Sequence, residues 1–286
     1  MQTLPDYMPR EHFQKLEGVS RPTASNYLKK LEGSGLLRSA PLYSGRGRPK
    51  KLYMVNRTRY QPSEPRVWDF GGFLKPLVKL EEDFDLRYAL GDPFSSSAYG
   101  RVFYHPPLQL WVEERGKKLL TGLYAPYPNV VKVHTAKEEM LARRERESGL
   151  WLLSPEDTVA LCLVPKEELR ESRYPVGPLD AASVLLRRYL VEDQGVDVPY
   201  LCKRAVEEGV TARLLELDGF LGNEYSLSTL DRKWRSTLEH FASLELETPP
   251  LGLDPEELET FVRVSRRYFE SKPWVRFFGV DDLAEN

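Results

Sequence analysis

The sequence has few sulfur ligands and no long apolar run. Only two cysteines occur among 286 residues, Cys162 and Cys202, and they lie far apart with no CxxC spacing. A disulfide framework or a zinc site is therefore not expected, and a reducing compartment is the default. No segment approaches the about 18–20 apolar residues that cross a bilayer, and no apolar signal core follows the first residues. We expect a soluble, cytoplasmic protein with no membrane contact.

Motifs of common enzymes are missing as well. The four histidines form no HExxH or HxH pattern, and "SSSA" lacks the GxSxG turn of a nucleophile elbow. The stretch "GRGRPKK" lacks phosphate-loop spacing, and the charged stretch 138–149 is expected to form a solvated helix. The sequence therefore predicts no catalytic residue, no metal ligand and no cofactor. Asparagine and glutamine number only five each, against 22 prolines, a composition typical of heat-adapted proteins.

Acidic residues are scarce in the first sixty positions. That segment holds twelve Lys and Arg against four Asp and Glu, a net charge of +8, so the remaining 226 residues carry −10. Such asymmetry indicates a polyanionic partner for the first segment, because the acidic remainder is repelled by nucleic acid. The sequence thus assigns any nucleic-acid contact to the N-terminal end.

Two helices are predicted in this basic segment. The first covers residues 8–18, and the second starts at Ser20, a good N-cap, with Pro22 tolerated in its first turn. Gly33 and Gly35 end the second helix. Its apolar stripe, at helical spacing, consists of Ala24, Leu28 and Leu31.

A β-hairpin is predicted to follow. The stretches "LRSAPLY" and "KLYMVN" read as two short strands, and "SGRGRPKK", residues 44–51, lies between them. Gly45 and Gly47 permit a tight reversal, and Pro49 stiffens its exit. The predicted order is helix, turn, helix, hairpin.

These two stretches, "VSRPTASNYLKKLEGSGLL" and "GRGRPKKLYMV", resemble the recognition helix and wing of winged helix-turn-helix transcription regulators over about the first sixty residues. The resemblance implies double-stranded DNA as the partner. Recognition helices place their N-terminal residues on base edges, where Arg suits guanine and Asn suits adenine, while lysines meet phosphates. The expected DNA-binding residues are Arg21, Thr23, Ser25, Asn26, Lys29, Lys30, Arg46, Arg48, Lys50 and Lys51.

The sequence leaves open the role of Tyr27 and the class of partner that this segment binds, and it adds an expectation for the wing tip. Tyr27 fits either the core or the DNA backbone. A protein-binding module with a solvated basic face is an alternative to DNA binding, and RNA is a weaker one, because no paired aromatic stacking positions occur on a sheet. "RGRP" flanked by Lys has the chemistry of an AT-hook, so Arg46 and Arg48 are expected to enter an A·T-rich minor groove from the wing tip.

The rest of the chain predicts an α+β, multidomain protein. A linker or docking segment is expected over 61–84, an α/β domain with a mixed sheet over 85–175, and a helical region over 176–286. Ser154 followed by Pro155, with Asp157 in a capping-box slot, predicts a helix start. Further carboxylates precede expected helices at Asp197, Asp231 and Asp254.

The order of these elements around "YALGDPFSSSAYG", "LQLWVEE", "NVVKVHT" and "LWLLSPEDTVALCLV" is similar to that of nucleotidyltransferase-fold domains, over about 85–215. The outline of the whole chain looks like the antitoxin half of abortive-infection systems. Metal-dependent nucleotidyl transfer requires two neighbouring carboxylates, and here one acid is missing, since Glu113 and Glu114 are adjacent and point to opposite faces of a strand. A catalytically silent domain is therefore expected.

The leading hypothesis is a sequence-specific DNA-binding regulator of transcription whose C-terminal part serves dimerisation, sensing or partner binding. A homodimer is expected, because paired half-sites multiply the limited specificity of one short helix. The alternatives are an antitoxin-like autorepressor with a cognate toxin as partner, and a nucleotidyltransferase tethered to nucleic acid.

Overall fold

The computed structural model describes residues 7–33, 37–42, 49–55, 70–100, 107–125, 130–165, 176–245 and 250–256, with 258, 259, 275, 278 and 280. The protein belongs to the α+β class and contains two separate β-sheets. None of the helices in these ranges has the length and apolar character that crossing a bilayer requires.

The N-terminal unit contains two helices and a small sheet. Helices α1 (Arg10–Glu17) and α2 (Arg21–Gly33) are joined by a short turn, as predicted from the sequence. Strand β1 (Tyr7–Pro9) pairs antiparallel with β3 (Lys50–Val55), and β3 pairs antiparallel with β2 (Leu37–Leu42). The predicted pair of strands around residues 44–51 is therefore present, although 43–48 lie outside the described residues.

Both faces of this small sheet are buried. On β3, Tyr53 packs with Met8 and Leu28 against α1 and α2, whereas Leu52 and Met54 belong to the main core of the molecule. This alternation follows from the period of two along a strand. The main core includes residues of α3 (Gly71–Phe84) and α5 (Glu114–Tyr124), so the N-terminal unit is docked onto the next part of the chain.

Helix α3 covers most of the segment that the sequence analysis assigns to a linker or docking segment. Its Leu74, Leu77 and Leu80 are fully buried, so this helix contributes one face to the core. Phe70, just before it, donates its backbone N–H to the carbonyl oxygen of Phe278 at 2.8 Å. Residues 56–69 lie outside the described residues, and the exact domain boundaries stay a prediction.

The central unit is built on a mixed sheet, as the sequence predicts. The sheet has five strands in the order β6-β5-β4-β8-β7. Strands β4 and β5 are antiparallel, β5 and β6 are parallel, β4 and β8 are parallel, and β7 and β8 are antiparallel. The strands are β4 (Tyr88–Leu90), β5 (Leu108–Val112), β6 (Val131–Thr135), β7 (Glu145–Glu147) and β8 (Leu150–Leu152). Its further helices are α4 (Phe94–Tyr99), α6 (Glu138–Ala142) and α7 (Pro155–Leu163).

The charged stretch 138–149 corrects an expectation. Helix α6 ends at Ala142, and β7 then forms an edge strand paired with β8. The guanidinium groups of Arg144 and Arg146 lie 4.3 Å and 5.6 Å from the ring centre of Trp151 on β8. These cation–π contacts across the strands require an extended backbone, which overrides the helical propensity of the sequence.

The C-terminal helices follow the predicted order: α8 (Val176–Leu186), a π-helical turn (Arg187–Val191), α9 (Val198–Glu208), α10 (Thr211–Tyr225) and α11 (Arg232–Ala242). The predicted caps are present, because Asp197 accepts the N–H of Tyr200 at 3.2 Å and Asp231 accepts that of Trp234 at 2.8 Å. Most of the helix expected after Asp254 lies outside the described residues.

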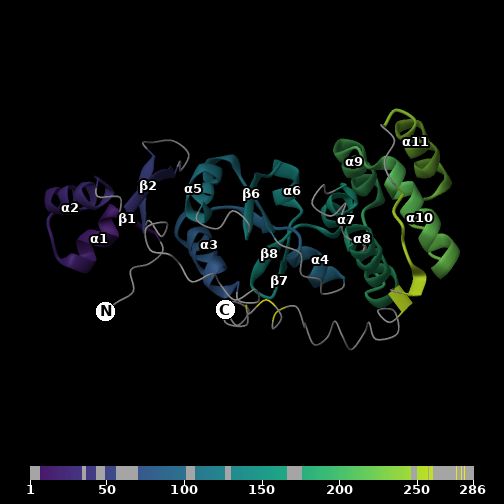
Figure 1. The fold of residues 1–286 in the computed structure, drawn as a ribbon, viewed down its shortest axis with the longest axis horizontal. Coiled ribbons are helices and arrows are strands. Elements are labelled where there is room, and N and C mark those ends of the chain that lie inside the picture. Colours follow the sequence, from purple (N-terminus) through teal and green to yellow (C-terminus); the bar gives the residue numbers. More distant parts are fainter. Residues whose placement is uncertain are drawn as a thin grey trace.

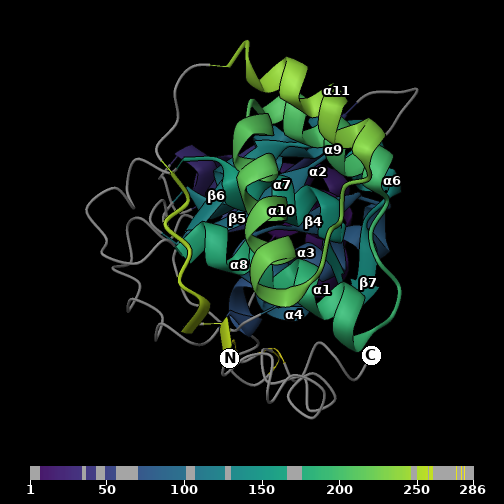
Figure 2. The ribbon, with the colours of Figure 1, turned by 90° about the vertical axis from the view of Figure 1, so that its right-hand side faces the viewer.

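The molecule is elongated (Figure 1), with the N-terminal unit at one end and α10 and α11 at the other. Helix α2 lies at the outer edge of the N-terminal unit, away from the central sheet. Figure 2 views the molecule from the end that carries α10 and α11, and these two helices lie in front of the central unit. The basic segment and the C-terminal helices are therefore far apart.

Candidate nucleic-acid interface

The start of α2 is fixed by Ser20. Its Oγ accepts the backbone N–H of Thr23 at 3.3 Å and lies 2.8 Å from the Thr23 hydroxyl oxygen. Pro22 is the second residue of the helix, where no intrahelical bond needs its missing N–H. The chain therefore enters α2 as the sequence predicts, with the residues that follow Ser20 at the exposed end.

The inner side of α2 anchors the helix. Ala24 and Leu28 are fully buried, and Leu28 packs with Met8 and Tyr53 of the sheet, next to Phe13 of α1. Leu31, expected on the same stripe, is half-buried. Most of the α2 side chains beyond this stripe are directed away from the sheet.

The predicted contact residues on α2 divide into two groups. Arg21, Asn26, Lys29 and Lys30 are exposed, whereas Thr23 and Ser25 are half-exposed. Ser25 accepts a long hydrogen bond of 3.5 Å from Arg10 of α1. Ser25 thus links α2 to α1, Thr23 takes part in the cap of α2, and the exposed four form the accessible surface.

Tyr27 is the residue whose role the sequence left open. Its side chain is 53% exposed, which makes it one of four large apolar or aromatic side chains exposed among the described residues. It is therefore excluded from the core of the N-terminal unit. Its position on α2 adds an aromatic ring to the surface that Asn26 and Lys30 share.

The cations of α2 differ in their partners from Arg87 of the central unit and Arg188 of the C-terminal helices. Within the described ranges, Arg21, Lys29 and Lys30 take part in no ion pair or side-chain hydrogen bond. By contrast, Arg87 contacts Glu113 and Glu138, and Arg188 contacts Glu145 and Glu192. The charge of α2 is consequently available to an external anion.

The two described lysines of the hairpin are less available. Lys51 pairs with Glu32 of α2 at 2.9 Å and lies 5.2 Å from the ring centre of Tyr53. Lys50 lies 5.2 Å from the ring centre of Phe84 on α3. Hydrogen bonds from Ser39 and then Lys51 lower the pKa of the Glu32 carboxyl, so the pair with Lys51 stays charged at neutral pH. Arg46 and Arg48 lie outside the described residues.

The two acids that follow β5 do not form the carboxylate pair that metal-dependent transfer requires. Glu113 follows β5 and is committed to structure, because its Oε1 accepts the N–H of Arg87 at 2.8 Å and the Nε of Arg115 at 2.7 Å. Glu114 begins α5 and is exposed. Both acids therefore lie after β5, at the N-cap and the first position of α5, and the expectation that they point to opposite faces of one strand is wrong.

The outward-alternating positions of β5 carry no acid either. They are Gln109 and Trp111, opposite Lys132 and His134 of β6. His134 Nε2 lies 2.6 Å from Gln109 Oε1, and its ring stacks on Trp111 at 4.6 Å. Burial, followed by Lys117 and Lys132, lowers the pKa of the His134 imidazole. An amide, an indole and a basic environment do not fit Mg²⁺, which prefers carboxylate oxygens.

Trp111 also fills the space next to the turn after β4. A Cβ on Gly91 would lie 3.0 Å from the indole Nε1 and 3.2 Å from Leu153 Cδ1. Asp92 follows Gly91 and accepts the Ser96 hydroxyl at 2.6 Å. The turn formed by Gly91 and Asp92 after β4 is therefore closed by a side chain of this protein.

A separate group of potential metal ligands lies deeper in the central unit. The side-chain donor atoms of Asp92, Cys162 and Asp180 lie within 4.8 Å of one another. All three residues are buried, and each takes part in a further polar interaction. No sequence pattern indicates this group, because its members come from three elements separated by many residues.

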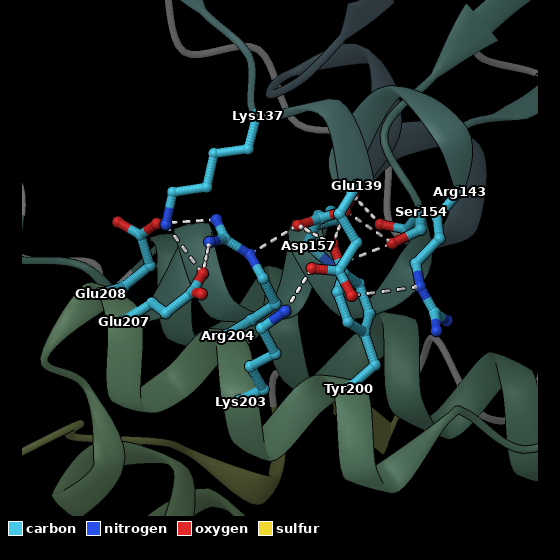
Figure 3. Close-up of polar contacts among 11 residues, drawn as sticks. Lys137, Glu139, Arg143, Ser154, Asp157, Tyr200, Lys203, Arg204, Glu207 and Glu208 are labelled. Atoms are coloured by element: carbon cyan, nitrogen blue, oxygen red, sulfur yellow. Dashed lines mark hydrogen bonds and ion pairs between the residues drawn. The ribbon is translucent and has the colours of Figure 1, made fainter.

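A buried polar network joins the central unit to the C-terminal helices (Figure 3). Asp157 of α7 accepts Arg204 Nε at 2.7 Å and the hydroxyl of Tyr200 at 3.1 Å. The guanidinium of Arg204 also reaches Glu207 and Glu208 on its own helix, α9. Figure 3 shows Lys137, next to α6, directed at Glu207, with Nζ 2.9 Å from Oε2.

The side chain of Asp157 differs from the capping-box prediction. Ser154 Oγ does accept the N–H of Asp157, at 3.2 Å, so the predicted N-cap is confirmed. The carboxylate, however, accepts the Ser154 hydroxyl at 2.9 Å and turns to Tyr200 and Arg204. Burial raises the pKa of the Asp157 carboxyl, and the Arg204 charge opposes that rise. Both carboxylate oxygens of Asp157 accept hydrogen bonds from side chains of the protein, which is typical of a structural network.

Neither the comparison with protein-family models nor that with curated proteins gave a match.

Proposed function

We propose that the chain is a sequence-specific, double-stranded-DNA-binding regulator of transcription that reads DNA with α2. The observation that carries the proposal is the outer face of α2, where Arg21, Asn26, Lys29 and Lys30 are exposed at one end of the molecule. The three cations there form no ion pair or side-chain hydrogen bond with a described residue, and the amide of Asn26 is of the type that pairs with adenine.

The order of elements supports the same proposal. Helix α1, a turn, helix α2 and the β2–β3 hairpin occur in the sequence order that winged helix-turn-helix domains imply. The strands β2 and β3 belong to the N-terminal unit, and Arg46 and Arg48, which lie between them in the sequence, are proposed as minor-groove contacts beside α2. The net charge of −10 on the remaining residues orients the molecule with the N-terminal unit toward DNA.

We further propose that two copies bind one operator. One helix of 13 residues reaches only a few base pairs, and repeated half-sites multiply the specificity. A catalytic role for the central unit is not proposed, because the donor groups on β5 and β6 do not fit the metal ions of nucleotidyl transfer.

The test is duplex binding measured by fluorescence anisotropy, with labelled genomic fragments, between about 50 and 200 mM salt. The affinity is expected to fall steeply with salt. Replacing Lys29 and Lys30 together by Ala is expected to reduce the salt slope by about two, roughly one for each lost phosphate contact.

A charge-matched control is available at the other end of the molecule. Arg232 and Lys233 are both exposed on α11, and replacing both by Ala is expected to leave the salt slope unchanged. Absence of duplex binding at low salt contradicts the proposal, as does an equal effect of the two double variants. Stoichiometry of two chains on one duplex supports the dimer, and one chain on one duplex overturns it.

A further inference from the structure

A cavity lies where the N-terminal unit meets the central unit. Its volume is about 260 Å³, close to the size of small-ligand pockets. The N-terminal unit lines it with residues of β1 and α1, and the central unit lines it with the last turns of α3. The lining side chains that matter below are Tyr7, His12, Lys15, Lys79, Asp83 and Phe84.

The acidic groups of this cavity already have partners. Asp83 accepts the hydroxyl of Tyr7, with an oxygen–oxygen distance of 3.5 Å. Glu11, which also lines the cavity, pairs with Arg10 at 3.1 Å. Burial, followed by the charge of Asp83, raises the pKa of the Tyr7 hydroxyl, so this group stays protonated and donates its hydrogen.

The basic groups of the cavity have no such partners among the described residues. Lys15 and Lys79 form no ion pair or side-chain hydrogen bond with any described residue, and the imidazole of His12 forms none either. Both lysines are exposed at the rim. Two cations and an additional N–H donor therefore line one cavity and donate to no acceptor among the described residues, which favours an anion.

The wall of the cavity is aromatic. The rings of Tyr7 and Phe84 lie with centroids 6.4 Å apart, and Pro9 adds apolar surface. An aromatic group packs well on such a wall, in an offset or edge-to-face arrangement. The combination of an apolar wall with convergent donors is typical of sites for small organic ligands.

We propose that this cavity binds a small aromatic anion, with its phosphate or carboxylate group at Lys15, Lys79 and His12 and its ring against Tyr7 and Phe84. Such a ligand contacts both units at once. Lys50 of β3 also lies 5.2 Å from the ring centre of Phe84. Phe84 therefore lines the cavity and also contacts the base of the hairpin. A ligand that favours one arrangement of the two units therefore alters DNA affinity, and DNA alters ligand affinity by the same factor.

The binding test uses the full chain without DNA and phenyl phosphate as the probe, measured by isothermal titration calorimetry. Saturable one-to-one binding is expected, with benzyl alcohol, the neutral comparator, at least tenfold weaker. Lys79→Gln and Lys15→Gln are each expected to weaken phenyl phosphate at least tenfold. Lys118→Gln, an exposed lysine on α5, and the Lys29→Gln/Lys30→Gln double variant are expected to leave it unchanged. No saturable binding, or equal losses in all variants, overturns the site.

The regulatory part rests on the proposed function and has its own measurement. Duplex affinity is compared with and without saturating phenyl phosphate, for the wild type and for Lys79→Gln. A change in the wild type that disappears in the variant supports the coupling, and an unchanged affinity in a protein that binds both ligands overturns it. If the protein binds phenyl phosphate but no duplex, the ligand site in the cavity is supported and only the proposed DNA-binding function is overturned.

Discussion

Arg204 and Asp157 form an ion pair of 2.7 Å whose side chains are 1% and 0% exposed. The pair links α9 to α7, and therefore the C-terminal helices to the central unit. Two charges inside a protein are tolerated only when their hydrogen-bonding capacity is satisfied. Here Tyr200 and Ser154 complete the carboxylate, while Glu207 and Glu208 complete the guanidinium.

Breaking this pair from one side is expected to destabilise the fold severely. Asp157→Asn and Arg204→Met each leave one buried charge without its partner, which costs about 3–5 kcal/mol. The free energy of unfolding, measured by urea denaturation, is expected to drop by that amount in each. The double variant is expected to lose clearly less than the sum of the two, because the partners act as a unit.

The control for this prediction is an exposed pair in the same region. Lys137 is 58% exposed and pairs with Glu207, and exposed pairs contribute under about 1 kcal/mol. Lys137→Gln is therefore expected to change the free energy of unfolding only slightly. Additive losses in the double variant, or a cost for Lys137→Gln equal to that of Asp157→Asn, contradict this account of the network.

Two helical glycines are expected to respond to alanine with opposite signs. Gly177 of α8 lies against α7, and a Cβ there would collide with the backbone carbonyl oxygen of Cys162, which cannot move independently. Gly177→Ala is therefore expected to lower the free energy of unfolding by about 1–3 kcal/mol. Gly219 of α10 has no atom within 4 Å of such a Cβ, and Gly219→Ala is expected to stabilise by about 0.5–1 kcal/mol. The same sign for both variants contradicts the close approach of α7 and α8.

The local elements of the fold are well predicted by local signals. Ser20 with Pro22, and Ser154 with Pro155, mark helix starts that the structure confirms. These signals work because a cap and the first turn of its helix are neighbours in sequence. The alternating strands and helices from residue 88 to residue 163 likewise predict a mixed sheet, and it is present.

Contacts between distant residues were not predicted. The partner of Asp157 is 47 residues away, and no periodicity indicates which buried Arg a capping residue will meet. One missed feature did have a signal, since "LYMV" in β3 is continuously apolar and such a run is typical of a strand buried on both faces. That pattern indicates that both faces of β3 are buried, whereas its packing against α3 and α5 is seen only in the structure.

Sequence readout and phosphate contact are expected to separate within α2. Asn26→Ala removes a bidentate group from the face proposed to meet the bases, so binding to the preferred duplex is expected to weaken by about 1–3 kcal/mol, with relaxed preference at one base pair. Lys29→Ala is expected to weaken all duplexes about equally. Binding to a library of duplexes with single base-pair changes distinguishes the two, and an identical profile for both variants contradicts base readout by Asn26.

The exposed aromatic ring of Tyr27 provides a third comparison on the same helix. If its hydroxyl donates to a phosphate, Tyr27→Phe weakens binding as much as Tyr27→Ala. If its ring contacts the sugar or a thymine methyl group, Tyr27→Phe retains the affinity. The 53% exposure of the ring favours a contact of one kind or the other, and unchanged duplex affinity in both variants excludes Tyr27 from the interface.

The wing tip is expected to distinguish flanking sequences. Replacing Arg46 and Arg48 by Ala is expected to weaken binding most on sites flanked by A·T runs, because narrow minor grooves concentrate negative potential that attracts arginine. The measurement compares duplexes that share one central site and differ only in flanks. An equal loss on G·C flanks reduces the two arginines to phosphate contacts.

His134 is expected to make stability depend on pH below neutrality. Its folded-state pKa lies below the ordinary value of 6.5 because of burial and the nearby Lys117 and Lys132. Above pH 6.5 the imidazole is neutral in both states, so its contribution to stability is fully present there. As the pH falls below that value, the unfolded chain takes up the proton first, and the free energy of unfolding decreases until the folded-state pKa is passed. His134→Gln is expected to flatten this part of the profile between about pH 7 and 5, whereas Lys118→Gln is expected to leave its slope in place. An unchanged slope in His134→Gln shows that another group titrates in this range.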